Sequence, residues 1–173
     1  MRLRLLIAAC TGFLALLGAS PAFSQHEGSA GPCSSGNVAR TSSYTMALDI
    51  GKQEEMYLPS EVKARHIKTG EVMLGGDMAM VDKTAGTKVF HLEVHICTKT
   101  GAVVTKLKPL IVVDDPAASM MTMKVPSAIM VGVGAPITDY HYGNDVALRP
   151  GDRVTVKVTV KGQVATFHAT VPK

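Results

Sequence analysis

The feature that most constrains the fold is a strict alternation of valine and polar residues near the end of the chain. Every second residue from Val154 to Val160 is valine, with threonine or lysine between, which is the period of a half-buried β-strand. Lys161-Gly162-Gln163 then forms a tight turn, and a second alternating run ends at Val171. These two runs predict an antiparallel hairpin.

Short segments of β character also fill the chain before this hairpin, and Gly, Pro or Asp separates most of them. They lie at 44–50, 71–74, 77–82, 88–97, 109–114, 119–125, 128–133 and 145–148. No stretch of ten or more residues has convincing helical periodicity. The pattern predicts an all-β domain, an antiparallel immunoglobulin-like β-sandwich of seven to nine strands.

The N-terminus has the pattern of an export signal. Arg2 and Arg4 precede an apolar stretch of 14 residues, Leu5–Gly18, and small residues before Gln25 mark a cleavage site. We expect residues 1–24 to be a signal peptide, 25–43 a flexible arm rich in Gly and Ser, and 44–173 one domain. No later segment approaches the ~20 apolar residues of a membrane-spanning helix, so the mature chain is predicted to be periplasmic without membrane insertion.

Charge argues against a nucleic-acid partner. The chain has a formal net charge of +4, which falls to +2 (16 basic against 14 acidic residues) without Arg2 and Arg4, and it has no long basic run. No Ser/His/Asp set, paired carboxylates or phosphate-binding glycine loop stands out. We therefore expect a binding protein and not an enzyme.

Export also changes what the three cysteines can do. Cys10 would leave with the signal peptide, so that Cys33 and Cys97 remain in an oxidising compartment. Two thiols allow one disulfide, between the arm and a strand. The alternative is that both cysteines stay unpaired and Cys97 is simply packed.

Candidate metal ligands occur on the predicted strand at 88–97. His91, Glu93 and His95 alternate with apolar residues and so share one strand face. Residues two apart on a face have Cα atoms about 6.5–7 Å apart, which lets His91 and Glu93 bind one ion. His95 lies about 13 Å from His91 on a flat strand and is not expected to share that ion. The alternative is an ordinary solvated face.

A second candidate region is the polar segment 139–145, which is predicted to be a loop because of its Gly, Asn and Asp residues. His141 stands there between two tyrosines, as a ligand or as a packed loop residue. Met130 lies eleven residues earlier, and its thioether is a soft ligand suited to copper(I), although most of the methionines are expected to fill the core.

His91-Leu92-Glu93 followed by His141-Tyr142-Gly143-Asn144 resembles the periplasmic ferrous-iron transport proteins, partners of bacterial iron permeases. The resemblance implies an immunoglobulin-like sandwich that forms a homodimer and binds copper, and also iron or manganese. We therefore expect copper or iron as the bound ion, with manganese or zinc as surrogates. It assigns His91, Glu93 and His141 as ligands. The family's methionine stands seven residues before the loop histidine, where this chain has Gly134, so Met130 is the candidate fourth ligand.

The sequence thus predicts a periplasmic protein that binds copper or iron for uptake or for delivery to an inner-membrane permease. The competing hypothesis is a structural or interaction module of the cell envelope that binds no metal. The sequence does not say which metal is physiological, because the affinity order of divalent ions favours copper whatever the task.

Overall fold

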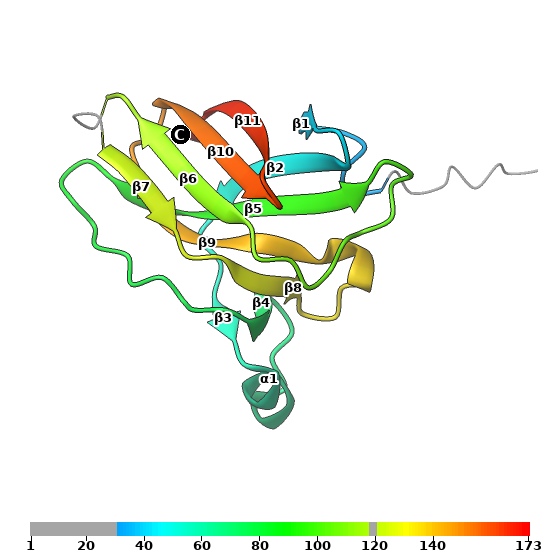
Figure 1. Ribbon diagram of the computed structural model, residues 1–173. Coiled ribbons are helices and arrows are strands. Elements are labelled where there is room, and N and C mark those ends of the chain that lie inside the picture. Colours follow the sequence, from blue (N-terminus) through cyan, green and yellow to red (C-terminus); the bar gives the residue numbers. More distant parts are fainter. Residues whose placement is uncertain (1–30, 118–120) are drawn as a thin grey trace, which may run out of the picture.

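The computed structural model describes residues 31–117 and 121–173. The expected signal peptide, its Cys10 and the first part of the arm lie outside the described residues. The described chain is all-β with two packed sheets, a 3-10 turn at Ile137–Asp139 and one short helix, α1 (Pro59–Arg65) (Figure 1). No helix of the described part is long and apolar enough to cross a membrane.

The larger sheet has seven strands in the order β1-β2-β5-β9-β8-β4-β3, and the smaller has four in the order β11-β10-β6-β7. Neighbours are antiparallel except for β3 and β4, which are parallel. The larger sheet comprises β1 (Asn37–Arg40), β2 (Tyr44–Lys52), β3 (Met56–Tyr57), β4 (Glu71–Gly75), β5 (Lys88–Thr98), β8 (Ala128–Gly132) and β9 (His141–Leu148). The smaller comprises β6 (Leu110–Asp115), β7 (Met121–Val125), β10 (Arg153–Val160) and β11 (Gln163–Thr170).

The C-terminal hairpin is confirmed. Strands β10 and β11 pair along their whole length, from Arg153 opposite Thr170 to Val160 opposite Gln163. Lys161 and Gly162 form the turn with φ of 46° and 77°, the left-handed conformation that a tight two-residue hairpin needs. The valines of β10 are buried in the core between the two sheets.

The hydrophobic core takes alternate residues of the two central strands of the larger sheet. Phe90, Leu92 and Val94 of β5 are buried in it, together with Tyr142 and Val146 of β9. Because successive side chains of a strand point to opposite faces, the residues between them lie on the outer face of the sheet. That outer face carries the candidate ligands.

Three expectations about segments need correction. The segment 77–82 is not a strand, because the buried Asn144 side chain bonds the backbone of Asp77 and of Ala79 in place of a neighbouring strand. The expected arm contributes strand β1, which pairs with β2. The described residues form eleven strands, against an expectation of seven to nine.

The segment 139–145 was also expected to be a loop, but only Asp139 and Tyr140 lie before the next strand. It continues as strand β9 from His141, since Tyr142, Val146 and Leu148 enter the core. Gly143 is required within this strand, because a Cβ atom there would overlap the carbonyl oxygen of Leu92 on β5. The glycine that suggested a turn instead allows close packing of the two central strands.

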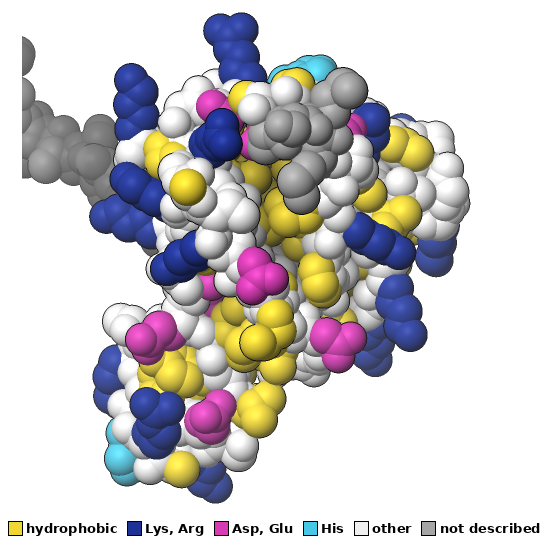
Figure 2. Space-filling view, turned by 90° about the vertical axis from the view of Figure 1, so that its left-hand side faces the viewer, with side chains coloured by type: hydrophobic (Ala, Val, Ile, Leu, Met, Phe, Trp, Pro, Cys, Tyr) yellow, Lys and Arg dark blue, Asp and Glu magenta, His cyan; other side chains and the backbone are white. Residues whose placement is uncertain are grey.

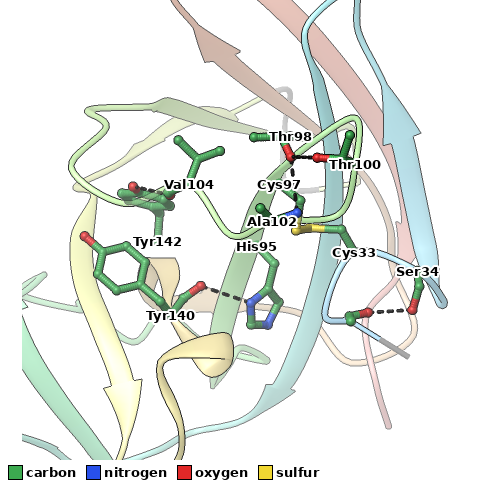
Figure 3. The surroundings of a disulfide bond; sticks show 11 residues. Cys33, Ser34, His95, Cys97, Thr98, Thr100, Ala102, Val104, Tyr140 and Tyr142 are labelled. Carbon is green, nitrogen blue, oxygen red and sulfur yellow. Dashed lines mark hydrogen bonds between the residues drawn. A yellow bond between two sulfur atoms is a disulfide. The ribbon is translucent and has the colours of Figure 1, made fainter. Parts of the chain in front are cut away.

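The predicted disulfide is confirmed. Cys33 and Cys97 are bonded with an S–S distance of 2.06 Å and a Cα–Cα distance of 6.2 Å. Both cysteines are buried, and the bond fixes the segment before β1 against the end of β5 (Figure 3). A disulfide fits a protein that folds in an oxidising compartment.

Candidate metal centre

His91 is fully buried on the outer face of β5 and is oriented by the neighbouring strand. Its direct cross-strand neighbour on β9 is Asp145, and His91 Nδ1 lies 3.0 Å from Asp145 Oδ1. A carboxylate can only accept this hydrogen bond, so Nδ1 carries the proton and Nε2 of the neutral ring keeps its lone pair. His91 Nε2 is buried and has no hydrogen-bond partner among the described residues.

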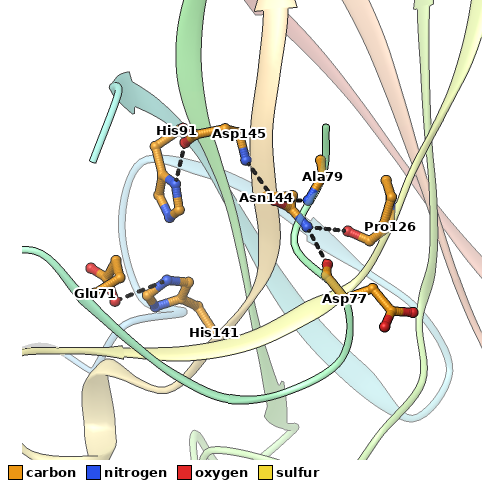
Figure 4. A network of polar contacts seen from close by, with 8 residues as sticks. All are labelled: Glu71, Asp77, Ala79, His91, Pro126, His141, Asn144 and Asp145. Carbon is orange, nitrogen blue, oxygen red and sulfur yellow. Dashed lines mark hydrogen bonds and ion pairs between the residues drawn. The ribbon is translucent and has the colours of Figure 1, made fainter. Parts of the chain in front are cut away.

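His141, the first residue of β9, is held in the same way. Its Nδ1 donates to the backbone carbonyl of Asp139 at 2.7 Å, and its buried Nε2 also lacks a hydrogen bond within the described chain. The rings of His91 and His141 lie edge to face with centroids 5.8 Å apart. Both Nε2 atoms are therefore free to bind a ligand in one buried space (Figure 4).

Two glutamates complete this group. Glu71 opens β4 and is 5% exposed, and its Oε2 lies 3.6 Å from His141 Nε2 without forming a hydrogen bond. Glu93 lies two residues after His91 on β5 and is half-buried. The ligand atoms of Glu71, His91, Glu93 and His141 all lie within 4.8 Å of one another.

These separations suit a metal ion. Ligand bonds of about 2.0–2.2 Å in a tetrahedron place the ligand atoms about 3.4 Å apart, so small side-chain movements would close the group around one ion. Two imidazole nitrogens and two carboxylates are donors that first-row divalent ions accept. A hydrogen bond from a ligating histidine to a carboxylate, as His91 makes to Asp145, is the usual outer support of such a site.

The ionisation of the two glutamates differs because their surroundings differ. Burial raises the pKa of Glu71 to about 8, with a further contribution from the negative charge of Glu54. Burial also acts to raise the pKa of Glu93, but contacts with His95, His141 and His91 outweigh it and hold that pKa below its usual value. Without a metal ion, Glu71 thus keeps its proton at neutral pH while Glu93 is a carboxylate.

The histidines respond to the same balance. Burial lowers the pKa of His141, only partly opposed by the charge of Glu93. Burial acts in the same direction on His91, but the hydrogen bond to Asp145 and the negative charges of Glu93, Asp145 and Glu71 together outweigh it, so the pKa of His91 is raised. His141 is therefore the ring most readily available as a neutral ligand.

His95 lies beside this group. The pairing of Val94 with Tyr142 brings His95 next to His141 at the following register position, and their ring centroids are 5.4 Å apart. His95 Nδ1 lies 3.2 Å from the backbone oxygen of Tyr140 (Figure 3). Its Nε2 lies 3.6 Å from Glu93 Oε2. It forms a second candidate group with Asp139 and His141, and it does not belong to the group that contains His91.

Met130 also lies at this site. It stands directly opposite His141 in the pairing of β8 with β9, so the two side chains share the outer face of the sheet. Met130 is fully buried yet outside the hydrophobic core cluster. The four residues expected from the sequence, His91, Glu93, His141 and Met130, therefore come together on one face.

Sequence reasoning missed Glu71 and Asp145. Glu71 follows a Thr-Gly turn at the start of a short strand, and no spacing links it to the histidines. Asp145 could have been found, because His141, Gly143 and Asp145 alternate as a strand face opposite His91 and Glu93. The Gly-Asn-Asp sequence hid that alternation.

Comparisons with known proteins assign no family. The chain matches no family model, no curated protein and no solved structure.

Proposed function

We propose that this protein is exported to the periplasm and binds a first-row divalent metal ion through Glu71, His91, Glu93 and His141. The observation that carries the proposal is that two buried imidazole Nε2 atoms without hydrogen bonds lie beside a buried glutamate oxygen in the same condition. Buried polar atoms without partners cost free energy, typically about 1–3 kcal/mol each. A bound cation would satisfy all three at once.

The proposed task is binding for uptake or delivery, and not catalysis. Four protein ligands fill a tetrahedral shell, whereas catalytic sites usually leave one position for water or substrate. Iron and copper are the proposed ions, with manganese or zinc as substitutes, because the nitrogen and oxygen donors suit all of them. An inner-membrane permease is the proposed recipient, and a homodimer the proposed assembly, both on the family resemblance.

The direct experiment is a set of separate titrations of the metal-free protein with Mn(II), Fe(II), Zn(II) and Cu(II), all under anaerobic conditions. His91→Ala, Glu71→Gln and His141→Ala should each weaken binding at least tenfold, because each removes one of four ligands. His168→Ala is the matched control, since His168 lies on the smaller sheet and its ring nitrogen contacts Thr155. Unchanged binding in the first three variants would leave a metal-free envelope module as the better hypothesis.

A further inference from the structure

Three methionines surround a hollow on the side of the molecule next to the candidate metal centre. Met78 and Met80 come from the segment between β4 and β5, and Met123 comes from β7. The hollow has a volume of about 350 Å³ and is also lined by Asp82, Lys124 and Asp145. Figure 2 views the molecule from this side and shows hydrophobic side chains gathered on it.

The methionines of the 76–87 segment lie at the surface and not in the hydrophobic core. Met80 is 95% exposed and Met78 is 50% exposed, whereas Met46 and Met130 are fully buried. Methionine is usually found in a protein where it fills irregular gaps in a core. Met80 fills none and Met78 is only half covered, so the chemistry of the thioether is a further reason to display them here.

The segment that carries these two methionines is held in place from within. The side chain of Asn144 is fully buried, and its Oδ1 accepts from Ala79 N at 2.9 Å. Its Nδ2 donates to the backbone oxygens of Asp77 at 2.8 Å and of Pro126 at 3.1 Å (Figure 4). Asn144 therefore fixes the backbone on both sides of Met78 and joins it to Pro126, which directly follows β7, and Met78, Met80 and Met123 line the same hollow.

We infer that Met78, Met80 and Met123 form a second metal site, selective for a soft monovalent ion such as Cu(I) or Ag(I). Neutral thioethers are preferred by these ions and are poor ligands for Fe(II), Mn(II) and Zn(II). Asp82 and Asp145 are among the residues that line the hollow, and their negative charge there favours a cation, in opposition to Lys124. The ion enters and stays as the monovalent form, so no electron transfer is involved.

The two sites would divide ions by softness. The centre of His91 and His141 offers nitrogen and oxygen donors, and the methionine hollow offers sulfur. Asp145 is shared by the two sites, because it lines the hollow and its carboxylate also accepts a hydrogen bond from His91 Nδ1. The inference does not depend on metal binding at the histidines, since the methionines come from other segments.

The test is NMR of protein labelled with ¹³C at the methionine methyl groups, titrated with Ag(I) as a redox-stable probe. The full chain carries Cys10→Ser, because a free thiol would capture the ion. The first equivalent of Ag(I) should shift the methyl signals of Met78, Met80 and Met123, and those of Met130 and Met56 should shift only later. The signals are assigned through single Met→Leu variants. Met78→Leu/Met80→Leu should lower Ag(I) affinity at least tenfold, while Met56→Leu in β3 should not.

A second measurement uses pH. Thioethers do not take up protons, so Ag(I) binding in the hollow should stay constant from pH 8 to 5. The His91→Ala/His141→Ala double variant should keep the same three shifts. A first shift at Met130, an affinity unaltered in Met78→Leu/Met80→Leu, or loss of the shifts in the histidine double variant would each overturn the inference.

Discussion

His91 Nδ1 and Asp145 Oδ1 lie 3.0 Å apart on directly opposed positions of β5 and β9. The hydrogen bond fixes both the proton on Nδ1 and the angle of the ring, so that Nε2 is presented to Glu71 and His141. Asp145 thereby determines which atom of His91 can act as a ligand without touching the ion itself.

We therefore expect Asp145→Asn to weaken divalent metal binding by about 10–100-fold, the usual effect of losing an outer partner of a ligating histidine. Asparagine has nearly the same shape, but it lacks the charge and can turn its NH₂ group toward the ring. A competition titration with Zn(II) measures the change, and Asp114→Asn on the smaller sheet serves as the control. Equal affinity in both variants would show that His91 is not a ligand.

The pH dependence of metal binding should follow Glu71. Its pKa of about 8 means that the metal-free protein holds a proton there at pH 7, and the ion must displace it. Affinity should fall as the pH is lowered from 8 to 5, as Glu71 and then the histidines retain protons. Binding at pH 7 should release close to one proton from Glu71, measured by calorimetry in two buffers of different ionisation enthalpy. Glu71→Gln should abolish that proton, and an unchanged release would contradict the assignment.

The raised pKa of Glu71 also predicts that the stability of the metal-free protein depends on pH. A carboxyl group whose pKa rises on folding contributes stability that is fully present below its usual 4.5 and is lost progressively as the pH rises to about 8. Glutamine cannot ionise, so Glu71→Gln should gain stability relative to the parent chain between pH 5 and 9. Thermal unfolding across this range measures the difference. A constant difference in melting temperature would mean that Glu71 keeps an ordinary pKa.

We expect the disulfide to contribute a large part of the free energy of unfolding. Closing a loop of 64 residues between Cys33 and Cys97 contributes about 4 kcal/mol by chain entropy. Cys33→Ala/Cys97→Ala should lower the free energy of unfolding by about this amount, as measured by urea denaturation with the metal-free protein. Denatured, unreduced protein should show no titratable thiol from this pair. Two thiols per chain beyond Cys10 would refute the bond.

The sequence predicted the strands whose two faces differ and missed the features that depend on contacts between distant segments. The alternations of β5 and of the C-terminal hairpin indicate their buried faces directly. The second half of strand β9 was predicted at 145–148, but its first half was missed because Gly143, which a close approach to Leu92 requires, is also a common turn residue. The expected strand at 77–82 does not form because its backbone bonds the side chain of Asn144, which lies far away in the sequence.

The site was predicted in part for the same reason. His91 and Glu93 share a strand face by local spacing alone, and the family resemblance added His141. Glu71 belongs to the group only because β4 pairs with β8, which in turn pairs with β9. Local spacing cannot report that chain of pairings, since it depends on the order of strands in the sheet.

The last prediction concerns His95, which distinguishes the proposed ligand set from an alternative one. His91→Ala should reduce divalent metal affinity at least tenfold, whereas His95→Ala should reduce it much less, because His95 lies outside the group of four. Yet His95 Nε2 lies 3.6 Å from Glu93 Oε2, and the pKa of His95 is raised because its interactions with Glu93, Tyr140 and Asp139 together outweigh the effect of burial. Its removal should therefore raise the pKa of Glu93 and weaken binding mainly at acidic pH. Isothermal titrations of both variants at pH 5.5 and 7.5 separate the two effects. If His95→Ala were as damaging as His91→Ala at pH 7.5, the ion would instead be bound by His95, Asp139 and His141, the second group on this face.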